Sequence, residues 1–110
     1  MRQYVIDQLR PEDYQTIKAY LDAHADDSGV DGLYWIPIED KLLSPVQRDH
    51  SDCRPFVFAL ELTPARLAAE FLVRSRSRMR CACIAYATDE QRDWLISMVD
   101  TILEKLGVST

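Results

Sequence analysis

The residues best suited to chemistry are all three cysteines of the chain and one of its two histidines. They form two local groups, His50-x-x-Cys53 and Cys81-x-Cys83. Proteins hold structural zinc with four Cys or His side chains at the corners of a tetrahedron. The two groups together therefore define a candidate Cys₃His zinc site.

The spacing of the second group argues against that site if residues 80–87 form a regular strand. On a strand the Cα atoms of Cys81 and Cys83 lie roughly 6.6 Å apart, whereas thiolates on one zinc ion converge to about 2.3 Å from the metal. Neither Gly nor Pro stands between Cys81 and Ala87 to form a turn. We therefore expect no stoichiometric zinc and small free thiols that fill a strand interior.

His50 and Cys53 also have the residue types of a general base and a nucleophile, with Asp49 or Asp52 as the orienting group. The surrounding polar run RDHSDC is more typical of a solvated helix end. The chain has no Gly-rich phosphate loop, HExxH or GxSxG motif. We therefore assign no catalytic residue and expect a protein that is not an enzyme.

An arginine run, RSRSRMR, places guanidinium groups at every second position. A row of this kind can bind phosphate groups bidentately, but single-strand nucleic-acid grooves also carry aromatic stacking platforms, and none lies inside the run. A net charge of −5 opposes a general nucleic-acid binder. The run is either a charged edge strand that is protected against pairing with other chains or an anion-binding site. The candidate anion-binding residues are Arg74, Arg76, Arg78 and Arg80.

The first half of the chain predicts short elements with clear boundaries. Pro11 followed by acidic residues starts a helix, and Ser44 with Gln47 forms a capping box for a second, short helix. Pro37 cannot donate to a strand ladder, so its strand belongs at an edge or ends there. The expected elements are a strand over 4–9, a helix over 11–24, a loop over 26–32, a strand over 33–38 and a helix from 45 to about 50.

The central stretch, residues 55–87, admits two structures. In the first, strands over 55–62, 67–75 and 80–87 form an antiparallel meander, with Pro64 at a favoured turn position. In the second, Thr63 caps a helix over 64–75, and the fold becomes α/β with a parallel sheet. The alternating arginines have the period of extended chain. This period favours the meander.

The last helix has the strongest local signals of the chain. Thr88 and Gln91 form a capping box, and an apolar stripe follows at helical spacing: Leu95, Met98, Val99, Ile102 and Leu106. We therefore predict a single α+β domain over residues 1–110. It would have two layers, with a mixed or antiparallel sheet of four to five strands and the C-terminal helix packed on one face.

The central strands are apolar on both faces, which a two-layer fold does not require. The second face carries small apolar side chains that either a helix or a second copy of the chain must cover. We therefore expect a homodimer that acts as a non-catalytic protein-interaction module, with an unidentified partner protein as a further option. The interface residues would be Val57, Ala59, Ala68 and Leu72.

The remaining sequence features predict a soluble cytoplasmic protein. No window approaches the ~20 apolar residues of a membrane span, and the first residues lack the pattern of a signal peptide. An odd number of cysteines does not fit a disulfide framework. We therefore expect reduced thiols.

Overall fold

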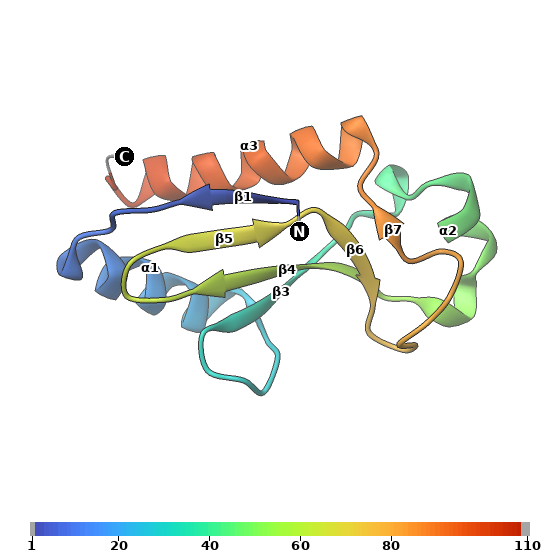
Figure 1. The fold of residues 1–110 in the computed structure, drawn as a ribbon, viewed down its shortest axis with the longest axis horizontal. Coiled ribbons are helices and arrows are strands. Elements are labelled where there is room, and N and C mark those ends of the chain that lie inside the picture. The colour runs from blue at the N-terminus through green and yellow to red at the C-terminus, as the bar shows by residue number, and fades with distance from the viewer. Residues whose placement is uncertain (1, 109–110) are drawn as a thin grey trace.

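The computed structural model describes residues 2–108, which form an α+β fold with an open antiparallel sheet and helices on one of its faces (Figure 1). Two short 3-10 turns, η1 (Asp40–Leu42) and η2 (Ser51–Cys53), join longer elements. Those elements are β1 (Gln3–Ile6), α1 (Pro11–His24), β2 (Asp26–Asp27), β3 (Leu33–Pro37), α2 (Pro45–Asp49), β4 (Phe56–Leu62), β5 (Leu67–Glu70), β6 (Leu72–Ser75), β7 (Ala85–Tyr86) and α3 (Asp89–Lys105).

The strands are arranged in the order β1-β5-β4-β3-β2, while β6 pairs with β4 and β7 pairs with β6. Each of these pairings is antiparallel, which confirms the predicted sheet class. The sheet has seven strands within residues 2–108 instead of four or five. The difference includes β2 and β7, which are too short to leave an alternation in the sequence.

The predicted strand over 67–75 is extended but divided. Ala69 stands opposite Leu60 and Arg74 stands opposite Val57, so residues 70–73 face only residues 58 and 59 of β4. Extra residues of this kind form a bulge, which bends a strand and increases its twist. β5 pairs with both β1 and β4, so the alternative helix over 64–75 is wrong.

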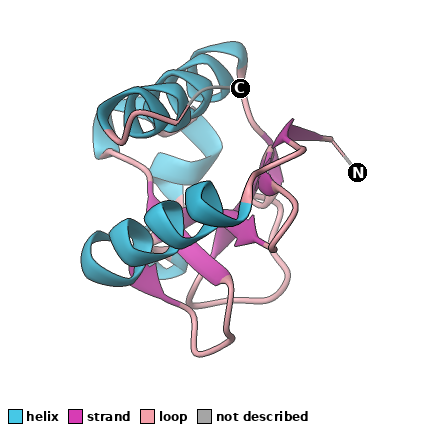
Figure 2. Ribbon diagram, turned by 90° about the vertical axis from the view of Figure 1, so that its left-hand side faces the viewer, coloured by secondary structure: helices cyan, strands magenta, loops and turns pink. Residues whose placement is uncertain are grey.

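Both long helices pack against the same face of the sheet. Figure 2 shows the helices on one side of the strands. Phe58 and Leu60 of β4 share one buried cluster with Ile17 of α1 and Leu95 of α3. This arrangement confirms the two layers and the packing of the C-terminal helix on the Phe face. The buried stripe of α3 differs from the predicted one: Leu95, Val99 and Leu103 are buried, and Ile102 is only partly so.

The helix starts follow the local signals closely. Pro11 is the first residue of α1, and both predicted capping boxes are present, at Ser44 with Gln47 and at Thr88 with Gln91. Side-chain caps of this type satisfy backbone N–H groups that have no partner within the helix. No helix within residues 2–108 is long and apolar enough to cross a membrane.

The predicted strand over 80–87 is wrong for most of its length. Only Ala85–Tyr86 pairs with β6, and the preceding residues form a loop and a turn. The turn is closed by the Ile84 N–H, which donates to the Cys81 carbonyl at 3.1 Å. The arginine row is also not extended, because Arg74 alone belongs to a strand and the other three lie in the loop after β6.

Candidate metal centre

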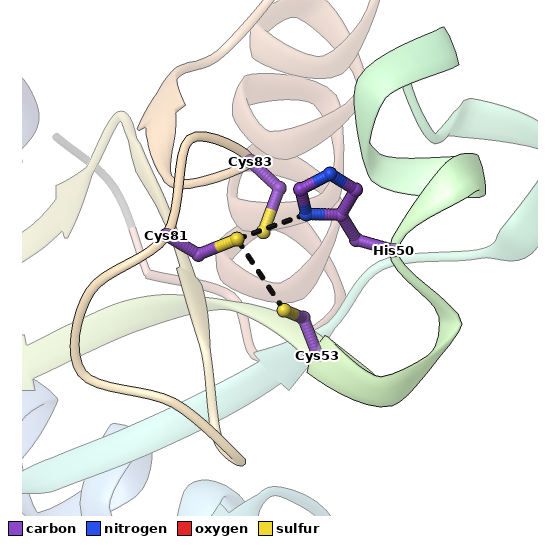
Figure 3. A group of neighbouring side chains, drawn as sticks. All are labelled: His50, Cys53, Cys81 and Cys83. Atoms are coloured by element: carbon purple, nitrogen blue, oxygen red, sulfur yellow. Dashed lines mark hydrogen bonds between the residues drawn. The ribbon is translucent and has the colours of Figure 1, made fainter.

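Strand pairing brings the two Cys/His groups together. Phe56, at the start of β4, stands opposite Ser75, at the end of β6. The segment before β4 and the segment after β6 therefore leave the sheet at the same end. His50 and Cys53 lie on the first segment, and Cys81 and Cys83 lie on the second; all four side chains converge (Figure 3).

The four candidate ligand atoms all lie within 4.8 Å of one another. The Cys81 sulfur is 2.9 Å from Nδ1 of His50 and 3.5 Å from the Cys53 sulfur. In a tetrahedral site with Zn–S bonds of about 2.3 Å, neighbouring sulfurs lie about 3.8 Å apart. The arrangement therefore has the size of a zinc tetrahedron and requires only small side-chain shifts to become one.

Cys81 and Cys83 are not on a strand, so the strand separation predicted for them is wrong. Ala82 and Cys83 occupy the middle of the turn between Cys81 and Ile84. A turn removes the fixed separation along a strand, and its reversal brings the two thiols to one side. This turn could not be predicted from residue types, since neither Gly nor Pro marks it.

The first group is shaped by a second local turn. His50 follows the last residue of α2, and the Cys53 N–H donates to the His50 carbonyl at 3.0 Å. The Cys53 carbonyl in turn accepts a hydrogen bond from the Ser75 hydroxyl, and the Arg54 carbonyl accepts one from Ser77. These two serines of the RSRSRMR run therefore tie the loop after β6 to the segment that carries the first two ligands.

A buried glutamine supports the second group. Nε2 of Gln47, in α2, donates to the Cys83 carbonyl at 3.3 Å. Gln47 is fully buried and completes the capping box of its own helix through Ser44. The capping role of Gln47 was predictable from local sequence, whereas this contact was not, because it joins residues 36 positions apart.

The three thiols have different environments. Cys53 and Cys83 are buried, and burial raises the pKa of Cys53 and raises that of Cys83 to about 12. Cys81 is half-buried, and hydrogen bonding from the Cys83 backbone N–H, with further help from neighbours including His50, lowers its pKa to about 6. Cys81 is therefore the thiol that is ionised near neutral pH. Three sulfurs and one imidazole form a soft ligand set, which suits zinc far better than magnesium or calcium.

The base–nucleophile pair that the sequence analysis considered and set aside, His50 with Cys53, is not formed. His50 faces Cys81 instead of Cys53. Asp52, one of the two proposed orienting groups, is paired with Arg78 at 2.8 Å. No hydrogen bond joins Asp49 to His50 in the part of the chain that the structure describes. His50 and Cys81 are within reach of each other, but a nucleophilic pair also needs a group that orients the base.

The candidate anion-binding arginines lie beside carboxylates. Arg74 is 3.0 Å from Glu70, and Arg78 is 2.8 Å from Asp52. Arg76 is 3.9 Å from Asp26, and among residues 2–108 Arg80 forms no ion pair. A cavity of about 230 Å³ places Trp35 of β3 beside this loop, an aromatic neighbour that the run itself lacks. Anion binding stays a prediction, and three of its four arginines already face a negative charge.

The predicted interface residues lie on the sheet face opposite the long helices. Val57, Ala59 and Ala68 are 1%, 4% and 2% exposed, and Leu72 is half-buried. Their cross-strand neighbours include Arg74 opposite Val57, Trp35 opposite Ala59 and Glu61 opposite Ala68. These larger neighbours bury the small side chains within one copy of the chain. Homodimerisation stays a prediction, and a partner would have to contact the larger neighbours.

An open groove with a volume of about 710 Å³ lies between α1, β3 and α3, away from the cysteines. Its walls include Tyr20 of α1 and three residues spaced by four along α3, Trp94, Met98 and Ile102. This groove explains why Ile102 is incompletely buried.

Comparisons of the chain with protein-family models, with curated proteins and with solved structures found no match. The chemistry of the side chains is therefore the basis for assigning a function.

Proposed function

We propose that this chain is a zinc-binding domain in which one Zn²⁺ is held by His50, Cys53, Cys81 and Cys83. The observation that carries the proposal is the convergence of four ligand atoms within 4.8 Å, from two segments far apart in sequence. Nδ1 is the histidine ligand atom, since it is the ring nitrogen that faces the Cys81 sulfur. The three thiolates and the metal together carry a net charge of −1.

The ligand count supports a structural role for the metal. Catalytic zinc sites keep one coordination position open for water or substrate, whereas structural sites use four protein ligands. Four protein ligands are available here, so the tetrahedron is complete without a water molecule. The metal would link the turn before β4 to the loop after β6.

The core of the protein lies between the sheet and the two long helices, and it includes Phe58, Ile17 and Leu95. Most of this cluster lies outside the metal site, although Cys53 and Cys83 belong to it. We therefore expect the metal-free chain to keep its sheet and helices while residues 77–84 become more mobile. Metal binding would then stabilise the folded state by its free energy of binding.

The non-catalytic interaction module predicted from the sequence is a separate proposal about the opposite sheet face. It is compatible with structural zinc, because neither role requires chemistry on a substrate. The metal site is the better supported of the two, since its four ligand atoms already meet within one copy of the chain.

The test is elemental analysis of protein purified with reductant and zinc, with native mass measured in parallel. We expect one zinc per chain, and loss of most of it in Cys83→Ser and His50→Ala. His24→Ala is the matched control, because His24 is the other histidine and is exposed on α1. Zinc absent from protein with intact thiols, or equal zinc in Cys83→Ser, would refute the proposal.

A further inference from the structure

We propose that this zinc site is a redox switch, in which peroxide joins Cys53 and Cys81 in a disulfide and thereby expels the metal. The inference rests on the proposed function, because it concerns regulation of the same site. It is carried by the unequal burial of the three thiols and by the short distance between two of them.

Cys81 is the sulfur that an oxidant reaches first. Cys53 and Cys83 are 2% and 1% exposed, whereas Cys81 is only half-buried. It lies at the start of the turn that follows the arginine loop. Oxidation of cysteine depends on thiolate character and access to solvent. A zinc-bound Cys81 satisfies both conditions, while the other two ligands are shielded by the chain.

Cys53 is placed to complete the reaction. Its sulfur lies 3.5 Å from that of Cys81, and a disulfide bond is about 2.05 Å long. Rotation about the side-chain bonds can supply a displacement of about 1.5 Å. Among the hydrogen bonds within residues 2–108, the one sulfur in contact with that of Cys81 belongs to Cys53, and Cys83 occupies the middle of the turn. Cys53 is therefore the resolving thiol.

The chemistry balances in two steps. The Cys81 thiolate attacks one oxygen of hydrogen peroxide, the O–O bond breaks, and hydroxide leaves as Cys81 becomes a sulfenic acid. The Cys53 thiolate then attacks the Cys81 sulfur, forms the S–S bond and expels a second hydroxide. The two thiolates have lost two electrons to peroxide, and two protons convert the hydroxides to water.

Disulfide formation removes two of the four ligands. His50 and Cys83 would remain, and two protein ligands do not complete the tetrahedral set that zinc requires in structural sites. The metal should therefore leave when the disulfide forms. A dithiol reductant reverses the reaction by thiol–disulfide exchange and restores the site.

The experiment treats the zinc-loaded protein with hydrogen peroxide and follows released zinc with a chromophoric chelator. Trypsin then separates the thiols, since cleavage after Arg48, Arg66, Arg80 and Arg92 leaves Cys53 in one peptide and Cys81 with Cys83 in another. We expect one zinc released per disulfide and a covalent link between the two peptides. Addition of dithiothreitol and zinc should reverse both changes.

Cysteine variants identify which two thiols form the disulfide. Metal-free Cys83→Ser should still form the inter-peptide disulfide, whereas Cys53→Ser should lose it and yield a sulfenic acid trapped by dimedone. A Cys81–Cys83 link, or zinc retained at peroxide levels that oxidise free thiols, would overturn the switch while leaving the metal site intact. No zinc before peroxide is added would refute both proposals, and the initial metal analysis identifies that case.

Discussion

The Gln91 side chain donates a hydrogen bond from Nε2 to Oε1 of Gln47, 2.9 Å away and 44 residues earlier in the chain. Both side chains are fully buried, and each is the third residue of a helix and completes its capping box. Gln91 also donates to the Leu42 carbonyl at 2.8 Å, and Gln47 donates to that of Cys83. The starts of α2 and α3 and the candidate metal turn are therefore joined through one buried polar network.

Gln91→Ala should destabilise the protein by about 1–3 kcal/mol, because it leaves the buried Gln47 oxygen and Leu42 carbonyl with fewer partners. Urea unfolding measures the change. Ser97→Ala on the exposed face of α3 is the control and should change the free energy of unfolding by no more than about 0.5 kcal/mol. Equal effects of the two changes would show that the network contributes little.

Zinc binding should release about two protons per chain near neutral pH. Burial raises the pKa of Cys53 and Cys83, so both thiols carry protons that the metal must displace, whereas the pKa of Cys81 is lowered to about 6. Affinity should therefore rise with pH, by about a hundredfold per unit. Calorimetry in buffers of different ionisation enthalpy counts the protons; an affinity independent of pH would contradict thiolate ligation.

Leu103→Ala should cost about 2–5 kcal/mol, because Leu103 is buried against the sheet and its removal leaves a cavity. Ile102→Ala should cost less than about 2 kcal/mol, since Ile102 already borders an open groove. Chemical denaturation of both variants gives the comparison. A larger cost at Ile102 would indicate that the groove is filled in solution.

Tyr34→Phe should lower the melting temperature at pH 7. The Tyr34 hydroxyl donates to Asp22 at 2.5 Å, and this hydrogen bond lowers the pKa of that carboxyl in the folded protein. The stabilisation is complete above the ordinary carboxyl pKa of about 4 and is lost as the pH falls through the lower folded value.

The difference between Tyr34→Phe and the wild type should therefore shrink below about pH 4. Thermal melts from pH 3 to pH 8 test this. Tyr14→Phe is the control, since its hydroxyl forms no hydrogen bond within residues 2–108. A difference that stays constant with pH would exclude the Tyr34–Asp22 pair as its cause.

The predicted homodimer can be tested by sedimentation at several concentrations. A stable pair would bury ~800 Å² per subunit, and Leu72→Glu, on the sheet face without long helices, should weaken it while retaining the secondary structure. Leu72 is the one predicted interface residue that is not fully buried in a single copy. A mass near 12.7 kDa at every concentration would exclude the dimer.

Local signals predicted the helices well because their causes are local. Pro11 and the two capping boxes satisfy backbone groups within a few residues of themselves, and α1 spans the predicted residues. The antiparallel meander was also predicted, although three of the four alternating arginines that favoured it lie in a loop. The bulge between β5 and β6 was not predicted, because it depends on how both partners of the strand align.

The metal cluster could be recognised by residue type but not by geometry. The turn at Cys81 is held by distant contacts, including the one from Gln47, and local sequence does not reveal them. The alternating arginines predicted an extended strand that is not formed, for a related reason. Ser75 accepts hydrogen bonds from the Ser77 and Arg78 N–H groups, both at 3.1 Å, which folds the run into a turn despite its period of two.

The pairing of Phe56 with Ser75 also couples assembly of the metal site to formation of the sheet. The ligands flank that pair in sequence, so the pairing of β4 with β6 brings the two ligand segments together and lowers the entropic cost of assembling the site. Cobalt in place of zinc would absorb light through its thiolate bonds once the ligands have assembled. The rise of that absorbance after rapid dilution from denaturant would time the assembly of the ligand set separately from the formation of α3.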